Sequence, residues 1–293
     1  MKPVLPLIVL LLSVVAAAAN PPFTWPHGEH AAIVLTYDDA VPSDLTVAIP
    51  QLDRANLKGT FFLMGKAMHA EDLPRWRAAA AAGHELANHT INHPCYRGTY
   101  DMPPQYNSEG YSVDTLLSEI NVMNILLTAI DGQPKHAFGT PCAQTRVGGG
   151  SDKDVDKDAE KKDYIGPLKA SGLASYIRDP AVPVVDQKTN QKTDSKPSPE
   201  ANSETSSATT SPVPKVSNTA FVGSSGAEMI AWIKEVEKSE GVGIIVFHGV
   251  GGDYLSVSAE AHQQLLDYLA AHRAEIWTAP YSEEMDYVVK HAH

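Results

Sequence analysis

The sequence predicts an α/β fold built on a parallel sheet that closes, or nearly closes, into a barrel. Two observations predict it. Short apolar runs typical of buried parallel strands recur along the chain, and segments with helical spacing of apolar residues separate them. Repeated strand–helix alternation requires right-handed crossovers and a covered sheet. A chain of 293 residues is long enough for one large domain of this type.

The first strand–helix–strand unit is predicted near the N-terminus. Residues 31–37 form an apolar run that ends in two aspartates, and residues 59–65 form a second run. Between them, apolar residues recur at helical spacing over 48–55. The remaining strands are expected at 84–89, 135–140, 173–177, 243–248 and 275–279. The remaining helices are expected at 73–82, 113–127, 228–238 and 259–273.

Three segments do not fit this alternation. Residues 1–19 have one early lysine, a short apolar run and three alanines at 17–19, which is the pattern of a cleaved secretory signal peptide. Residues 151–163 are almost all charged, and residues 186–217 are polar with hardly an apolar residue. Both are expected to be mobile insertions, because they lack the apolar surface that would offset the cost of ordering them. Residues 20–293 are then expected to form one domain.

Charge and hydropathy restrict the partners and the location. The formal net charge of −12 leaves no basic excess for nucleic-acid phosphates and makes a strongly anionic polymer a poor substrate. After the predicted signal peptide, no segment is expected to span or stably anchor in a membrane. The protein is therefore expected to be secreted or periplasmic. Its only two cysteines, Cys95 and Cys142, could form a disulfide there or stay as separate buried thiols.

Adjacent aspartates, Asp38 and Asp39, stand at the carboxyl end of the first predicted strand. Ligands and catalytic groups collect at such strand ends in parallel sheets and barrels. If the strand ends there, one aspartate can ligate a cation while the other remains free as a base. The alternative is a helix cap or a solvated turn.

A histidine pair follows a later strand. His89 and His93 can present both imidazoles to one cation if their segment makes a helical turn, although two independent histidines would look the same. With Asp39 they make a set of two histidines and one carboxylate that leaves coordination positions open for water or a carbonyl. Zinc is the default cation for this set, and iron, cobalt or nickel also fit it. His84 does not begin a zincin motif, because Asn88 stands where its second histidine would be.

His248 directly follows the predicted strand at 243–248 and so lies on the same rim as the aspartates. The ordinary pKa range of histidine suits protonation of a leaving group near neutral pH. The alternative is an incidental histidine in a glycine-rich turn.

These motifs resemble those of a known family. Thr36-Tyr37-Asp38-Asp39, His89-Thr90-Ile91-Asn92-His93 and Val246-Phe247-His248 are similar to the first, second and fifth motifs of the polysaccharide deacetylases, the NodB-homology enzymes of carbohydrate esterase family 4. The resemblance implies a distorted (β/α) barrel, a divalent metal that is usually zinc, and hydrolysis of N- or O-acetyl groups on an acetylated polysaccharide or oligosaccharide. It covers nearly all of residues 20–293 apart from the two insertions.

The resemblance also implies residue roles. Asp38 would be the general base that activates a metal-bound water, and Asp39, His89 and His93 would hold the metal. His248 would be the general acid that protonates the departing amine or alcohol.

The sequence departs from the family pattern in two motifs, because the third motif is changed and the aspartate-tryptophan pair of the fourth motif is not evident. The third family motif usually carries an arginine beside the base, but residues 138–143 contain none, and Arg178 is the candidate that could supply this charge from another strand.

If the second and third motifs face each other as in the family, Cys95 and Cys142 lie close enough for a disulfide between two active-site loops. The alternatives are an amidase or esterase for a small non-polymeric substrate, or a catalytically weak homologue that only binds carbohydrate.

Overall fold

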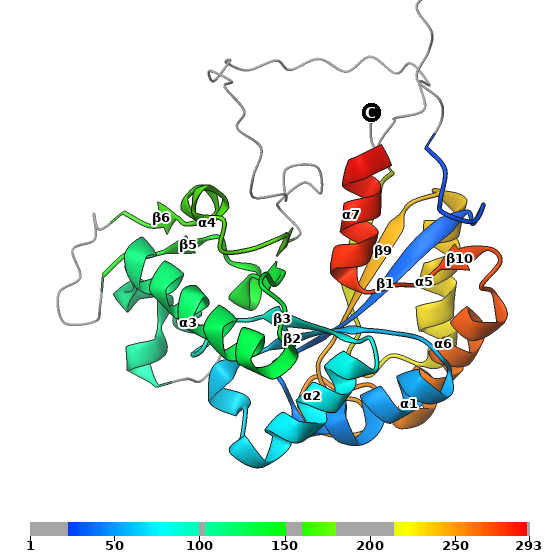
Figure 1. The fold of residues 1–293 in the computed structure, drawn as a ribbon, viewed down its shortest axis with the longest axis horizontal. Coiled ribbons are helices and arrows are strands. Elements are labelled where there is room, and N and C mark those ends of the chain that lie inside the picture. Colours follow the sequence, from blue (N-terminus) through cyan, green and yellow to red (C-terminus); the bar gives the residue numbers. More distant parts are fainter. Residues whose placement is uncertain (1–22, 100–102, 151–159, 180–213, 292–293) are drawn as a thin grey trace, which may run out of the picture.

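A computed structural model describes residues 23–99, 103–150, 160–179 and 214–291 (Figure 1). The strands of its main sheet are β1 (Ala31–Asp38), β2 (Thr60–Leu63), β3 (Glu85–Asn88), β4 (Phe138–Gly139), β7 (Ile177–Arg178), β8 (Val216–Ala220), β9 (Val242–Phe247) and β10 (Ile276–Trp277). Seven of them follow the order β7-β4-β3-β2-β1-β9-β8, and β10 pairs with the first residues of β1. Every pairing in this sheet is parallel.

The sheet curls into part of a barrel and stays open between its two edge strands, β7 and β8, which do not pair with each other in the described part of the chain. The predicted parallel α/β fold is confirmed, and its form is the distorted (β/α) barrel that the motifs implied. All carboxyl ends of the strands therefore meet at one rim, where Asp38, Asn88 and Phe247 each end a strand.

The helices are α1 (Ile49–Arg54), α2 (Leu73–Ala81), α3 (Val113–Asp131), α4 (Ile165–Ser171), α5 (Gly226–Lys238), α6 (Ala259–Ala271) and α7 (Tyr281–His291). Helices α1, α2, α5 and α6 lie along the outside of the sheet (Figure 1). Their apolar residues form one core cluster with alternate residues of β1, including Ile33, Leu35 and Tyr37. The opposite face of the same strand, with Ala32 and Val34, packs against α7.

Side chains alternate along β1, so the inner face continues from Ala32 and Val34 to Thr36 and Asp38. Helix α7 fills the amino-terminal part of this inner face with Tyr281 and other apolar side chains. Apolar packing thus fills one end of the interior, and polar side chains fill the end at the carboxyl rim.

Helix α3 is the one described helix that is long and apolar enough to cross a membrane by length and composition. The core helix of a soluble protein passes the same test, and α3 has the features of one. Ser112 caps its start, Gly132 ends it in a left-handed conformation, and its buried residues recur every three or four positions. Those buried residues are Leu116, Ile120, Met123, Leu127 and Ile130.

The structure also has elements that the sequence patterns did not indicate. Helices α4 and α7 and strand β8 were not expected, nor was the antiparallel pair β5 (Arg146–Val147) and β6 (Lys162–Asp163). The predicted insertion at 151–163 therefore ends in a strand, and the one at 186–217 ends inside β8. The sequences of β6 and β8 are polar because β6 is exposed and β8 is a half-buried edge strand. The predicted signal peptide and the rest of both insertions lie outside the described residues.

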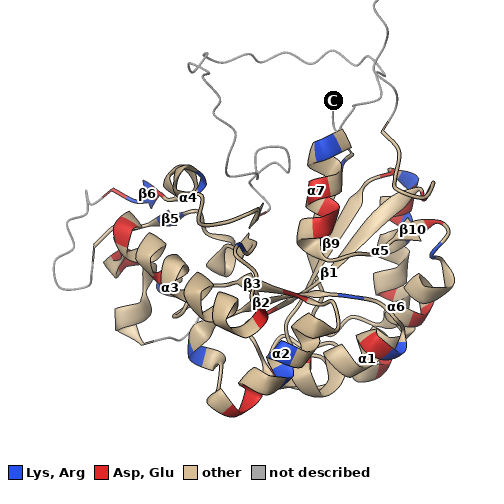
Figure 2. Ribbon diagram, in the orientation of Figure 1, with Lys and Arg blue, Asp and Glu red and all other residues tan. Residues whose placement is uncertain are grey.

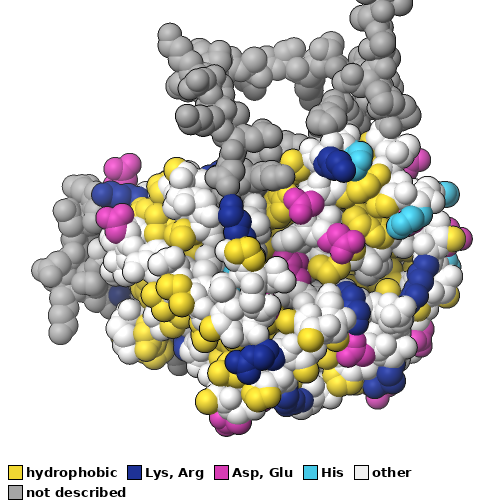
Figure 3. Space-filling view, viewed as in Figure 1, with side chains coloured by type: hydrophobic (Ala, Val, Ile, Leu, Met, Phe, Trp, Pro, Cys, Tyr) yellow, Lys and Arg dark blue, Asp and Glu magenta, His cyan; other side chains and the backbone are white. Residues whose placement is uncertain are grey.

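Charged residues of both signs are scattered along the outer helices (Figure 2). The space-filling view of the same face shows them interspersed with apolar side chains (Figure 3).

Candidate metal centre and active site

The aspartate pair lies where β1 ends and the chain turns. Asp38 is the last residue of the strand, and Asp39 has a φ of +78°. This left-handed turn allows two neighbouring side chains to reach the same rim, because they no longer alternate across the sheet. Both carboxylates are buried.

The segment from His89 to His93 is a loop held by side chains, so the two histidines meet without the helical turn that we expected as the condition for sharing a cation. Thr90 and His93 both have positive φ. The Thr90 hydroxyl accepts a hydrogen bond from the His93 backbone N–H at 2.8 Å, and Glu119 of α3 accepts from the N–H groups of Ile91 and Asn92. These side-chain acceptors replace the backbone hydrogen bonds that a helical turn would have made.

Three atoms from these two loops converge. The Nε2 atoms of His89 and His93 are 3.1 Å apart, and the Oδ1 atom of Asp39 is 3.5 Å from each of them. Ligands at zinc–nitrogen distances of 2.0–2.1 Å in a tetrahedral site are separated by about 3.3 Å. The set therefore fits one small divalent cation, and the structure brings together the three residues named as ligands from the sequence.

Hydrogen bonding fixes which nitrogen of His89 carries the proton. Its Nδ1 lies 2.9 Å from the carbonyl oxygen of Gly139, which can only accept, so Nδ1 donates and Nε2 keeps a lone pair. A Cβ on Gly139 would come within 3.2 Å of this Nδ1 and 2.8 Å of Arg178 Nη2, so glycine permits the close approach. Outer partners of this kind fix the orientation of metal-ligating histidines.

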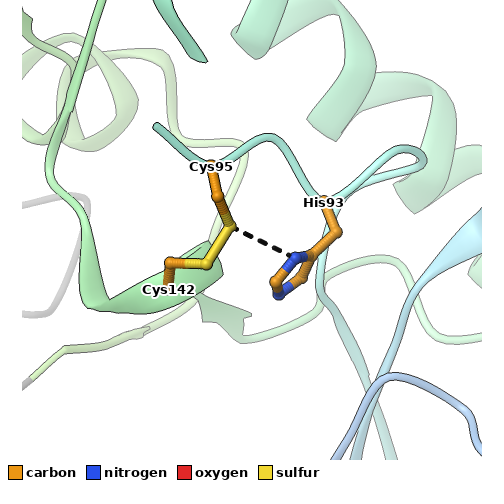
Figure 4. A group of neighbouring side chains, drawn as sticks. All are labelled: His93, Cys95 and Cys142. Atoms are coloured by element: carbon orange, nitrogen blue, oxygen red, sulfur yellow. Dashed lines mark hydrogen bonds between the residues drawn. A yellow bond between two sulfur atoms is a disulfide. The ribbon is translucent and has the colours of Figure 1, made fainter. Parts of the chain in front are cut away.

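His93 has a different outer partner. Its Nδ1 lies 3.5 Å from the Sγ of Cys95, which is bonded to Cys142 in a disulfide (Figure 4). A disulfide sulfur carries no proton, so Nδ1 is the donor and Nε2 faces His89 with its lone pair. Burial lowers the pKa of His93 to about 3, so the imidazole is neutral, the form that binds cations. The expected disulfide is confirmed.

Arg178, at the end of β7, reaches across the interior to Asp38. Its Nη2 donates to Asp38 Oδ2 at 2.6 Å, its Nη1 donates to Thr36 Oγ1 at 2.7 Å, and the guanidinium lies over the Phe62 ring. Burial opposes ionisation of Asp38, but the charge and hydrogen bond of Arg178 favour it, and the pKa is lowered to about 2. Asp38 is therefore a carboxylate at neutral pH. Its Oδ1 is buried and has no hydrogen-bond partner among the described residues.

His248 follows β9 and is partly accessible. Its Nε2 lies 3.8 Å from Asp39 Oδ2, and Asp38 Oδ2 lies 3.7 Å from His89 Nε2, so both predicted catalytic residues border the ligand set. A cavity of about 260 Å³ opens beside them between β7 and β8. Asp38, His89, His93, Arg178 and His248 contribute to its wall, together with Asn218, Thr219 and Ala220 of β8.

The sequence patterns did not indicate Tyr254. Its hydroxyl donates to Asp39 Oδ2 at 2.6 Å, and its ring lies 6.0 Å from that of His248. It follows the glycines after His248, a position where composition alone predicts a turn. The proximity of a tyrosine to the histidine motif was the only available signal.

Buried carboxylates, neutral imidazoles and an adjacent histidine around one cation-sized gap are the groups of a metal-assisted hydrolase. Residues 26–164 match the family model for polysaccharide deacetylase, a match that includes the aspartate pair and the histidine pair. The chain therefore contains a NodB-homology domain of the polysaccharide deacetylase type, carbohydrate esterase family 4. Arg178 and His248 lie beyond the matched residues.

Three solved structures are similar to this chain. A mutant of a family 4 pseudoenzyme has a TM-score of 0.50 at 15% identity over 92% of this chain and 72% of that one. The family 4 domain of a xylanase from the hindgut metagenome of Trinervitermes trinervoides has 0.49 at 16% identity, over 88% and 90%. The catalytic domain of a peptidoglycan N-acetylglucosamine deacetylase from Eubacterium rectale has 0.49 at 19%, over 91% and 94%. A search of curated proteins found no match.

Proposed function

We propose that the protein hydrolyses N- or O-acetyl groups of a carbohydrate with the help of a divalent cation, most naturally zinc. The observation that carries this proposal is the convergence of Asp39 Oδ1 and the Nε2 atoms of His89 and His93, with Asp38 and His248 bordering them. Cobalt, nickel and iron fit the same ligands. The match to the polysaccharide deacetylase model supports the deacetylase reaction.

Asp38 is the proposed general base. One of its oxygens is fixed by Arg178, and the other is buried without a partner and available to accept a proton from the attacking water. A bound divalent cation would supply Lewis acidity to that water and to the acetyl carbonyl. The low pKa of Asp38 keeps the acceptor ionised before substrate enters.

His248 is the proposed general acid. It stands on the same cavity wall as Asp38 but enters from β9, and its side chain is partly open to solvent. An imidazolium there can transfer a proton to the departing amine or alcohol when the carbon–nitrogen or carbon–oxygen bond breaks.

An acetylated polysaccharide or oligosaccharide outside the cytoplasm is the proposed substrate. The cavity opens at the sheet edge, and Asn218 and Thr219 of β8 line it with groups that can hydrogen-bond sugar hydroxyls. The Cys95–Cys142 disulfide is typical of oxidising compartments, which together with the predicted signal peptide supports a secreted or periplasmic location.

A catalytically weak carbohydrate-binding homologue remains the alternative, since a similar fold occurs in a protein described as a pseudoenzyme. The missing third-motif arginine would favour this alternative. The contact between Arg178 and Asp38 favours catalysis instead, because it provides a guanidinium beside the base from another strand.

The test measures acetate release from N-acetylglucosamine oligomers and acetylated xylo-oligosaccharides, with N-acetylglucosamine as the small substrate. We expect a chelator to stop release from an oligomer and zinc or cobalt to restore it. Asp38→Ala should retain the cation and lose turnover by about 10²–10⁴-fold, the usual contribution of a general base. Release that continues after complete chelation, or full activity in Asp38→Ala, would contradict this mechanism.

A further inference from the structure

The loop after His248 connects the protein surface with a proposed metal ligand. Tyr254 in this loop is 48% exposed, yet its hydroxyl reaches inward and donates to Asp39 Oδ2 at 2.6 Å. Asp39 itself is 1% exposed. A tyrosine with a solvated ring and a hydroxyl bonded to a buried carboxylate is placed to orient that carboxylate.

The glycines of the loop make this position possible. Gly249 donates its N–H to the Tyr254 carbonyl at 3.1 Å, and a Cβ on Gly249 would lie 2.0 Å from the Gly252 carbonyl oxygen. Gly251 has a φ of +72°. Any other residue at Gly249 would displace the turn, so the glycine-rich sequence serves to fold the loop back towards Asp39.

The loop is also attached to the chain segment that follows Asp39. Asp253 accepts a hydrogen bond from the Ser43 backbone N–H at 2.8 Å, and the Ser43 hydroxyl accepts one from the Val250 N–H at 3.0 Å. These two hydrogen bonds connect the loop that carries Tyr254 to the segment that follows Asp39. They hold the two residues in place relative to each other, in addition to the bond between their side chains.

The two oxygens of Asp39 have different surroundings. Oδ2 accepts a hydrogen bond from the Tyr254 hydroxyl, whereas Oδ1 is buried, has no hydrogen-bond partner among the described residues and faces His89 and His93. Asp38 follows the same pattern, with Oδ2 bonded to Arg178 and Oδ1 without a partner. In each aspartate a protein donor holds Oδ2, and in Asp39 this leaves Oδ1 facing the two histidines.

We propose that Tyr254 is a positioning residue for the cation, whose hydroxyl orients Asp39 so that the carboxylate binds through Oδ1 alone. This inference rests on the proposed function, because it requires a cation at Asp39, His89 and His93. Hydrogen-bonded outer partners of metal ligands typically contribute 10–100-fold to metal affinity. A tyrosine that only packed the loop would contribute nothing to that affinity.

The test compares Tyr254→Phe with a matched control, Tyr268→Phe. Both remove a tyrosine hydroxyl that bonds to a carboxylate, and the Tyr268 bond to Glu237 joins α6 to α5 away from the cavity. Zinc affinity is measured by competition with a chromophoric chelator, and cobalt-loaded protein is compared by visible absorption. We expect about 10–100-fold weaker zinc binding and an altered cobalt spectrum in Tyr254→Phe only. Its zinc-free unfolding temperature should match that of wild type.

The outcomes separate the two proposals. Wild-type zinc affinity in Tyr254→Phe, with an unchanged cobalt spectrum, would overturn the role of Tyr254 and leave the metal centre intact. Failure of the wild-type protein to bind zinc or cobalt at all would instead overturn the proposed function. Equal loss of affinity in both variants would show that the effect is not specific to Asp39, and the inference would fail.

Discussion

The two ends of the same parallel sheet both carry histidines and carboxylates, and they use them differently. At the amino end of β3, Glu85 accepts hydrogen bonds from Thr60, from the Ser282 backbone N–H and from the Ser282 hydroxyl. It thereby caps the first turn of α7, where unpaired N–H groups favour a carboxylate. His84 accepts from the Gly59 N–H and contacts Asp53. These side chains stabilise the fold.

At the carboxyl end of the sheet, the corresponding groups are left incompletely paired. Asp38 and Asp39 each keep one buried oxygen without a hydrogen-bond partner, and the lone pairs of His89 and His93 face each other at 3.1 Å. Buried lone pairs without donors are costly unless a cation or substrate satisfies them. Buried atoms without a partner among the described residues also occur on the wall of the amino-end cavity, at His136 Nδ1 and Ser175 Oγ. What marks the carboxyl end as the functional one is that Asp39 Oδ1 and the two imidazole Nε2 atoms converge within 3.5 Å of one another.

Cavity size does not make the same distinction. The amino end has the larger cavity, of about 940 Å³, with His84, Glu85 and Ser282 on its wall, against about 260 Å³ at the carboxyl end. Convergence of unsatisfied groups locates the chemistry better than volume does in this molecule.

The largest expected effect comes from replacing by alanine the histidines that flank the two ends of β3. His89→Ala removes one of three ligands, so zinc affinity should fall by more than the roughly 100-fold attributed to outer partners, and acetate release should cease. His84→Ala is the matched variant, and we expect it to keep zinc affinity and turnover while losing about 1 kcal/mol of unfolding free energy. Zinc titration, acetate assays and denaturant unfolding check both variants.

The contrast between the two ends would be broken if His84→Ala also lost zinc, or if His89→Ala kept it. Either result would mean that the chemistry does not belong to the carboxyl end alone.

A smaller effect, visible in the pH dependence, is expected from Arg178→Met. Burial opposes ionisation of Asp38 and the Arg178 charge favours it, so the pKa of Asp38 should rise from about 2 when the charge is removed. The acidic limb of kcat/KM should then move to higher pH. In the wild type, the stabilisation from this lowered pKa is present above 3.8 and is lost as pH falls through about 2. Breaking the buried pair should also cost about 3–5 kcal/mol of unfolding free energy.

An Arg178→Lys variant keeps the positive charge and serves as the control. We expect its acidic limb to lie between those of the wild type and Arg178→Met. An unmoved acidic limb in Arg178→Met would show that this arginine does not set the protonation of the base.

The sequence was sufficient to predict the strand ends that carry the site. The apolar runs before Asp38 and before His248 are long and are buried except at Val246, so their pattern is unambiguous. The alternation along β1 also places Asp38 on the inner face. The geometry of the histidine pair was not predictable in this way, because the left-handed residues Thr90 and His93 depend on acceptors such as Glu119 from α3.

Other features depend on contacts between distant segments. Strand β8 has a polar sequence, and only its pairing with β9 makes it a strand. Arg178 could be suggested from the missing third-motif arginine, but its reach to Asp38 follows from the position of β7 beside β4. Tyr254 could not be found from spacing, because a glycine turn folds it back onto Asp39.

The central claim is that the carboxyl end of the sheet holds one cation between Asp39, His89 and His93. Anomalous diffraction from crystals of the full chain grown with zinc, measured on both sides of the zinc absorption edge, tests it most directly. We predict a single strong peak about 2 Å from Asp39 Oδ1 and from the Nε2 atoms of both histidines. Absence of a peak there, or a zinc ion bound only elsewhere on the molecule, would contradict the claim.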